Sequence, residues 1–205
     1  MKKILYLYGG PKFHATEEGG KFLQDLLKAD GRFELEMTSD LDALKNLTHS
    51  QYAAIVIYTT GFKDDLTEAR EKGLIDFVKI RKEQISIHSA TDSFRGSRTY
   101  IEMINGEFMT HPRLHEFPVL IAEKNHYLTA RMQDFSIYDE MYHLQNFDPD
   151  KCTVLAQTWW QAKKIPLVYV RNYGKGRVVY LANGHTNQAW KHPEFQKLLV
   201  RAIAW

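Results

Sequence analysis

The chain has 205 residues, of which 44% are hydrophobic and 25% are charged, as is typical of one globular domain with a large core. Its net charge of +2, with scattered lysines and arginines, argues against a nucleic-acid or anionic-membrane partner, and the longest apolar run, Ala53 to Tyr58, is too short to cross a bilayer. The single cysteine, Cys152, excludes an internal disulfide and a cysteine-only metal site, and it fits a reducing, cytoplasmic location.

Strand and helix signals alternate through the first half of the chain. Short apolar runs predict four strands, at Lys3–Tyr8, Phe33–Met37, Ala53–Tyr58 and Ile85–Ile87. Helices are predicted from Thr16 as N-cap, over Leu41–Leu47 and over Leu66–Lys82. This order of elements predicts an open, mostly parallel sheet with helices on both faces, in which Ile85–Ile87 is a central strand.

The strand Ile85–Ile87 stops abruptly at His88, and small or helix-capping residues follow from Ser89 to Asp92. This pattern predicts a sharp strand-to-helix turn of the kind that presents a serine or cysteine nucleophile in hydrolases. Here the exposed position holds a histidine, which acts as a base, a proton donor or a metal ligand. We expect the His88 side chain to face solvent and to bury little surface.

The second half of the chain is richer in extended segments. A short helix is predicted over Tyr100–Asn105, ended by Gly106 in a left-handed conformation, and a last helix over Pro193–Trp205 with proline in its first turn. Extended segments are predicted at Phe117–Glu123, Phe135–Gln145, Lys151–Gln157, Ile165–Asn172 and Arg177–Asn183. Residues 1–205 are therefore predicted to form a single α/β domain with an antiparallel extension at one edge of the sheet.

Ligands of open parallel sheets bind beyond the carboxyl ends of the strands. The loops predicted at those ends carry Gly10, His14, Gly61, His88 and Asp92. The last two strands read as a hairpin joined at Gly174. If its first strand runs antiparallel to the core, the second runs parallel, and His185 after it lies at the same edge as His88.

Three further groups of residues are candidates. In an extended segment, Glu140 and Tyr142 point to one face and Asp139 to the other, so either face could contact a ligand. Arg95, close to the turn at His88, is a candidate for binding an anionic group. His111 lies in a predicted loop and is a further candidate for substrate binding.

Four segments resemble one known family, in order along the chain. They are Ser86–Ser93, Met103–Phe108 with His111-Pro112, Asp139–Tyr142, and Gly174–Tyr180 leading to Gly184-His185. Together they are similar to the ThuA-like, or trehalose-utilisation, family. The resemblance implies the class I glutamine amidotransferase-like fold, a flavodoxin-like three-layer sandwich, and a role in carbohydrate catabolism, but it implies no specific reaction.

The sequence departs from the amidotransferases of that superfamily at the catalytic residue. Those enzymes place a cysteine at the elbow and a histidine after a late strand, whereas this chain has His88 at the elbow and His185 at the late position. Cys152 lies at a predicted strand and cannot replace the missing nucleophile. Glutamine thioester chemistry is therefore not expected.

Two classes of function stay open. The first is an enzyme, a hydrolase or an isomerase, acting on a sugar derivative with His88 and His185 as base and acid and with Glu140 or Asp92 sharing protons. In a metal-assisted form, His14, His88, His185 and a carboxylate would bind the ion, but no compact metal motif is present and the cofactor is left unassigned. The second is a non-catalytic carbohydrate-binding or regulatory protein. Whether the chain forms a homo-oligomer is also open.

Overall fold

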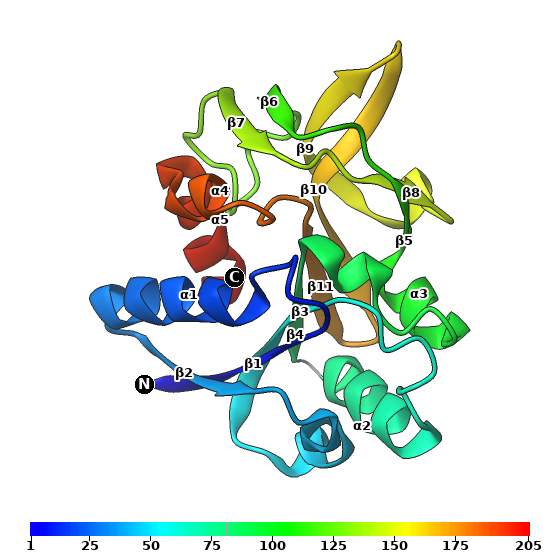
Figure 1. The fold of residues 1–205 in the computed structure, drawn as a ribbon. Helices are drawn as coiled ribbons and strands as arrows, with labels where there is room; N and C mark the ends of the chain where they lie inside the picture. Colours follow the sequence, from blue (N-terminus) through cyan, green and yellow to red (C-terminus); the bar gives the residue numbers. More distant parts are fainter. Residues whose placement is uncertain (81) are drawn as a thin grey trace.

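The computed structural model describes residues 1–80 and 82–205, and its centre is a nine-stranded sheet of order β2-β1-β3-β4-β11-β10-β9-β6-β7 (Figure 1). Five neighbouring strands are parallel: β2 (Phe33–Thr38), β1 (Lys2–Gly9), β3 (Tyr52–Thr59), β4 (Glu83–Ile87) and β11 (Gly176–Leu181). They form a flavodoxin-like parallel core. The prediction that the strand before His88 is central and parallel to its neighbours is confirmed, because β4 pairs with β3 on one side and β11 on the other.

The remaining strands extend this sheet in antiparallel fashion. β10 (Lys163–Tyr173) pairs with β11 in the predicted hairpin, and its other edge pairs with β9 (Thr153–Trp160). β6 (His115–Ile121) and β7 (Phe135–Asp139) complete the sheet. A separate two-stranded sheet joins β5 (Glu107–Thr110) to β8 (His143–Gln145). The predicted antiparallel extension at one edge is therefore confirmed.

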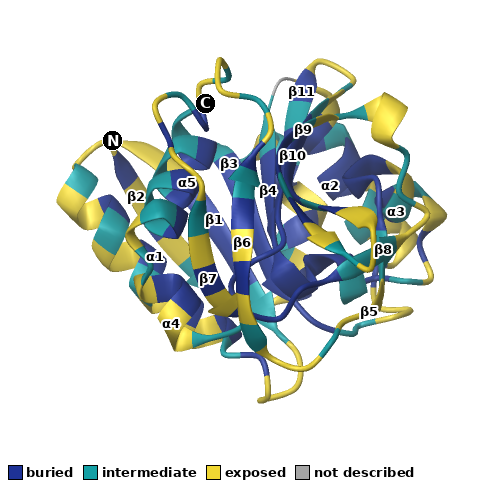
Figure 2. Cartoon of the chain, turned by 90° about the horizontal axis from the view of Figure 1, so that it is seen from above, coloured by how far each residue is buried: buried dark blue, intermediate teal, exposed yellow. Residues whose placement is uncertain are grey.

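Helices cover both faces of the parallel core. On one face lie α1 (Thr16–Asp30), α4 (Asn187–Lys191) and α5 (Pro193–Ala204), and on the other lie α2 (Glu68–Lys79) and α3 (Arg98–Ile104) (Figure 1). Three 3₁₀ segments, η1 (Leu41–His49), η2 (His88–Asp92) and η3 (Pro149–Lys151), complete the elements. The central strands are almost wholly buried between the helix layers (Figure 2), which makes the fold the predicted three-layer sandwich.

The predicted ends of three helices, α1, α2 and α3, differ from those in the structure. The helix predicted over Leu66–Lys82 covers only Glu68–Lys79, and position 81 lies outside the described residues. The residue with left-handed backbone after α3 is Asn105, with φ of 61°, rather than Gly106, because asparagine tolerates this conformation better than most residues. Thr16 is the first residue of α1 and its N-cap is Ala15.

No helix in the part of the chain that the structure describes is long and apolar enough to cross a membrane.

The largest correction concerns the extended segment predicted over Phe135–Gln145. The structure divides it into β7, which pairs with β6, and β8, which pairs with β5 in the smaller sheet. Between the two strands the chain runs through Glu140, Met141 and Tyr142 without a strand partner. This interruption brings the Glu140 and Tyr142 side chains to the carboxyl edge of the parallel core.

Candidate functional site

The turn after β4 forms as an elbow at His88. This residue has a φ of 46°, in the left-handed region that residues other than glycine rarely occupy, and η2 begins there. Its carbonyl oxygen accepts hydrogen bonds from the hydroxyls of Thr91 and Tyr180, each at 3.2 Å. These bonds hold a backbone conformation that would otherwise be unfavourable.

The expectation that His88 faces solvent was wrong, because its side chain is fully buried. The ring of Tyr142 lies over the imidazole with 3.8 Å between the ring centres. The covering residue comes from the chain between β7 and β8, whose path the sequence pattern did not predict. His88 is therefore part of an enclosed site.

Four side chains converge at this edge of the sheet, and we call them the histidine–glutamate cluster: His14, His88, Glu140 and His185. Each offers one ligand atom, and these atoms all lie within 4.8 Å of one another. The imidazole centres are 5.0–5.4 Å apart. His14 follows β1, His88 follows β4, Glu140 follows β7 and His185 follows β11, so the predicted convergence of His88 and His185 at one edge is present in the structure.

Hydrogen bonds define which nitrogen of two histidines carries the proton. Nδ1 of His88 lies 2.7 Å from the carbonyl oxygen of Ala182, which can only accept, so Nδ1 is the donor. Nδ1 of His14 lies 2.8 Å from the hydroxyl of Thr60, and that hydroxyl donates its own proton to Ser89 at 2.6 Å. With the proton on Nδ1, each ring in its neutral form has its lone pair on Nε2, on the other side.

Glu140 lies next to one ring nitrogen of His88 and one of His185. Its Oε2 lies 3.3 Å from Nε2 of His88 and 3.2 Å from Nδ1 of His185. Both nitrogens are buried, and neither has a hydrogen-bond partner among the described residues. Nε2 of His14 lies 3.1 Å from the Tyr142 hydroxyl. A buried lone pair next to a carboxylate oxygen is unfavourable unless a proton or a cation lies between them.

The charges in the cluster follow from burial and from this crowding. Burial, with His88 and His185 nearby, lowers the pKa of His14 to about 3. Burial and His88 also lower the pKa of His185. Burial acts to raise the pKa of Glu140, but the adjacent histidines outweigh it and hold the pKa below its ordinary value. The lowered pKa values of His14, His185 and Glu140 favour two neutral imidazoles and one carboxylate at neutral pH, the protonation states that bind a divalent metal.

Two of the spacings in the cluster also fit a tetrahedral ion. Zinc binds histidine nitrogen and carboxylate oxygen at ~2.0–2.2 Å, so two of its ligand atoms lie roughly 3.3–3.5 Å apart. The distances from Glu140 Oε2 to His88 and to His185, 3.3 and 3.2 Å, already match this value. The bonds that His88 donates to Ala182 and that His14 donates to Thr60 are the outer-sphere contacts that fix ligand tautomers in metal sites.

Asp139 is buried next to His185, and both of its carboxylate oxygens accept hydrogen bonds. It accepts backbone N–H groups from Gly184 at 2.7 Å and from His185 and Thr186 at 3.1 Å each. Burial raises its pKa, although these N–H groups and the nearby His88 act in the opposite direction. Through these bonds Asp139 holds the backbone of His185, and its contact with substrate stays a prediction.

Asp92 and Arg95 pair with each other and are not part of the cluster. Nη1 of Arg95 lies 3.0 Å from the Asp92 carboxylate, and its Nε lies 2.8 Å from Glu107. Burial nevertheless raises the pKa of Asp92. The pair connects the elbow to β5, so the geometry favours Glu140, of the two acids predicted, as the partner of His88.

The two glycines predicted to bind substrate, Gly10 and Gly61, adopt backbone conformations with positive φ that other residues rarely adopt. Gly10 has a φ of 111°, and a Cβ atom there would lie 2.4 Å from the carbonyl oxygen of Thr60. Gly61 has a φ of 82° and exchanges backbone hydrogen bonds with the segment after the elbow, from Asp92 to Phe94. Both glycines hold the chain around Thr60, whose role in orienting His14 could not be recognised from the sequence.

His111 and Tyr142 lie at the entrance to the cluster. Nε2 of His111 is 3.5 Å from Oε1 of Glu140, its ring stacks on Tyr142, and a third of its side chain is exposed. Among the histidines around Glu140 it is the most exposed. Both residues therefore lie where a ligand would enter, and their binding of substrate stays a prediction.

Cys152 lies far from this chemistry, just before β9. Its thiol contacts the carbonyl oxygens of Asp148 and Pro149 at 3.8 Å, and burial raises its pKa to about 11. We expect Cys152→Ser to leave metal content and turnover unchanged and to lower the free energy of unfolding by at most ~1 kcal/mol. Loss of activity in a folded Cys152→Ser protein would instead support a thiol mechanism.

Comparison with known proteins agrees with this architecture. The chain superimposes on a ThuA-like protein from Bacteroides uniformis with a TM-score of 0.83 and 19% identity, covering 98% of this chain and 89% of the other. A ThuA-like protein from Parabacteroides merdae superimposes with a TM-score of 0.86 and 18% identity, covering 100% of this chain and 89% of the other. A GMP synthase subunit from Thermoplasma acidophilum superimposes with a TM-score of 0.64 and 10% identity, covering 100% of this chain and 93% of the other.

These similarities, all below 25% identity, establish the fold, and no curated protein matches the sequence. The family is shown by a separate comparison. The model of the ThuA family, described as trehalose utilisation, matches residues 3–205, nearly the whole chain. The chain therefore belongs to the ThuA, or trehalose utilisation, family.

Proposed function

We propose that this protein is an enzyme that acts on a sugar or sugar derivative, and that its histidine–glutamate cluster binds a divalent transition-metal ion. The observation that carries the proposal is the approach of two buried, unpartnered nitrogens, from His88 and His185, to the same oxygen of Glu140. The family description, trehalose utilisation, supports a sugar as substrate.

An ion held by these four residues would supply a Lewis acid for a hydroxyl or carbonyl oxygen of the sugar. The Thr60 hydroxyl orients His14 through its Nδ1, and the Tyr142 ring covers His88 and keeps water away. His111 is close enough to Glu140 and exposed enough to exchange protons with a bound sugar. Hydrolysis and isomerisation both use this combination.

Two other uses of the cluster compete with this proposal. In a metal-free enzyme, His88 and His185 would act as base and acid and Glu140 would balance their charge. In a non-catalytic protein the same residues would only bind a sugar. The first alternative leaves Nε2 of His88 without a proton to share with Glu140 as long as that ring is neutral with its proton on Nδ1, and for this reason we favour the metal site.

The test begins with chelator-treated protein titrated with Co²⁺ and Zn²⁺, together with NMR of trehalose and nitrophenyl glucosides incubated with the loaded enzyme. We expect one ion per chain, a tetrahedral Co²⁺ spectrum, and sugar conversion that requires the ion. Release of glucose, with nitrophenol from the glucosides, would indicate hydrolysis, and one product of unchanged mass would indicate isomerisation. Full turnover by metal-free protein would support the base–acid pair, and metal-independent sugar binding without turnover would support the non-catalytic alternative.

A further inference from the structure

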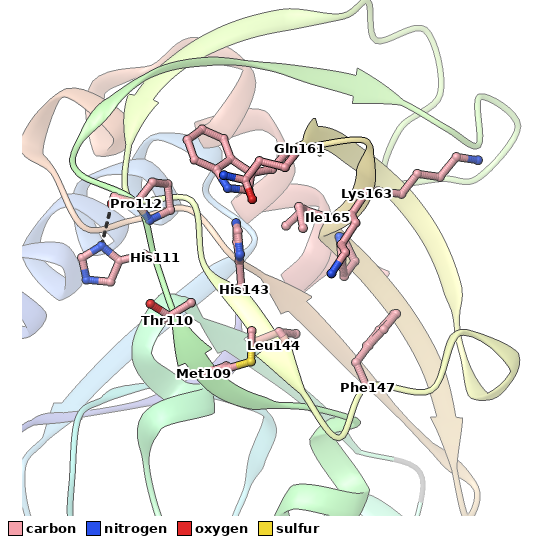
Figure 3. Close-up of a pocket in the computed structure, with 13 residues that line it drawn as sticks. Met109, Thr110, His111, Pro112, His143, Leu144, Phe147, Gln161, Lys163 and Ile165 are labelled. Carbon is pink, nitrogen blue, oxygen red and sulfur yellow. Dashed lines mark hydrogen bonds between the residues drawn. The ribbon is translucent and has the colours of Figure 1, made fainter.

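A cavity of about 600 Å³ lies beside the cluster, between the small β5–β8 sheet and the turn from β9 to β10 (Figure 3). Clefts of roughly 300–1,000 Å³ are typical of small-molecule sites. The sequence pattern did not predict this cavity, because β8 and the turn come together only when the segment after β7 leaves the main sheet.

The cavity adjoins the candidate active site at His111. This residue lines the cavity, and its Nε2 also lies 3.5 Å from Oε1 of Glu140. In Figure 3 His111 lies at one end of the lining residues, with Phe147 and Lys163 toward the other end. A ligand with two linked units could therefore place one unit at the cluster and the other in the cavity.

The lining carries positive charge without an opposite charge. It contains Lys163, Lys164, His111 and His143 and no aspartate or glutamate among the described residues. Neither lysine forms an ion pair within the part of the chain that the structure describes, although Nζ of Lys164 lies 5.6 Å from the centre of the Trp159 ring. A neutral sugar presents hydroxyl protons that carboxylates accept best, so this lining is better suited to an anion.

Two more residues complete a binding surface. Nε2 of His143 is buried without a hydrogen-bond partner among the described residues, and its ring points toward Gln161 (Figure 3). The indole of Trp160, which packs against His143 and His115, lines the same cavity. An aromatic surface of this kind packs against the apolar face of a sugar ring, while the polar groups bind its substituents.

We infer that this cavity is a second substrate subsite, which binds a sugar unit carrying a carboxylate or a phosphate next to the unit that reacts at the histidine–glutamate cluster. The inference rests on the proposed function in its assignment of the reacting unit. Three residues of the cavity make the contacts: Lys163 neutralises the anionic group, His143 hydrogen-bonds the sugar, and Trp160 packs against the ring.

The test is equilibrium binding of glucose, glucuronate and glucose 6-phosphate to the full-length protein at constant ionic strength. We expect an anionic probe to bind on the order of tenfold more tightly than glucose, as for one additional charge-assisted contact of ~1.4 kcal/mol. A preference for both anions would indicate a general anion subsite, and a preference for one would identify a carboxylate or a phosphate. Equal binding of all three probes, or binding of none, would overturn the inference.

A matched pair of variants locates the effect. The double variant Lys163→Gln/Lys164→Gln should lose the preference for anions, whereas Lys28→Gln/Lys124→Gln, which removes the same charge from exposed lysines outside the cavity, should keep it. If both double variants keep the preference, the anion binds elsewhere and the inference fails. Because binding is measured without turnover, this outcome is independent of whether the cluster binds a metal or performs catalysis.

Discussion

His88→Ala is expected to abolish turnover and to weaken metal binding by at least on the order of 100-fold, since it removes one of four ligands from the cluster. It should also lower the free energy of unfolding by about 2–4 kcal/mol, because the side chain is fully buried and its Nδ1 donates to Ala182. Metal titration and thermal melting measure the two effects separately.

Two further variants distinguish an effect on metal binding from an effect on stability. His49→Ala removes an exposed histidine at the end of η1 and should leave metal stoichiometry, turnover and melting temperature unchanged. His88→Gln keeps more of the buried volume and an N–H donor while removing the imidazole, so it should lose the metal at a smaller cost in stability. A His88→Gln protein that binds one ion with unchanged affinity would contradict the assignment of His88 as a ligand.

The second large effect is expected from Asp139→Asn. The amide has one acceptor oxygen and an NH₂ group that would face a backbone N–H of Gly184, His185 or Thr186. We expect a loss of ~2–3 kcal/mol in unfolding free energy, or roughly 4–12 °C in melting temperature. Because Asp139 positions His185, metal affinity should also fall by roughly 10–100-fold.

The control for this variant is Asp134→Asn, because Asp134 is exposed and accepts a single backbone N–H, that of Ile121, at 2.8 Å. It should change stability by less than ~1 kcal/mol and leave metal affinity unchanged. If Asp139→Asn and Asp134→Asn behave alike in both measurements, Asp139 does not hold the His185 loop.

The parallel core could be predicted from the sequence because its signals are local. Buried strands such as β1, β3 and β4 are short apolar runs, and the hairpin turn at Gly174 determines that β11 runs parallel to β4. From this topology alone, His88 and His185 were expected at one edge of the sheet. The predicted directions of the strands were therefore sufficient to predict where these two histidines meet.

The rest of the candidate site depends on contacts between residues far apart in the sequence, which no local sequence pattern indicates. The exit of the chain from β7 before Glu140 places Tyr142 over His88, and this non-local packing is the reason why His88 is buried rather than exposed. The proton positions of His14 depend on Thr60 and Ser89, which are far from it in sequence. Asp92 was predicted as a possible catalytic acid from its place after the elbow, yet Arg95 pairs with it.

The position of β11 in the sheet has a consequence for how the chain is made. β4 lies between β3 and β11, so one of its edges has no partner until Gly176–Leu181 has been synthesised. A nascent chain that already contains the first four strands therefore exposes an apolar strand edge on the ribosome for the translation of almost ninety further residues. During that interval, association with other chains competes with folding, and chaperones would protect this edge.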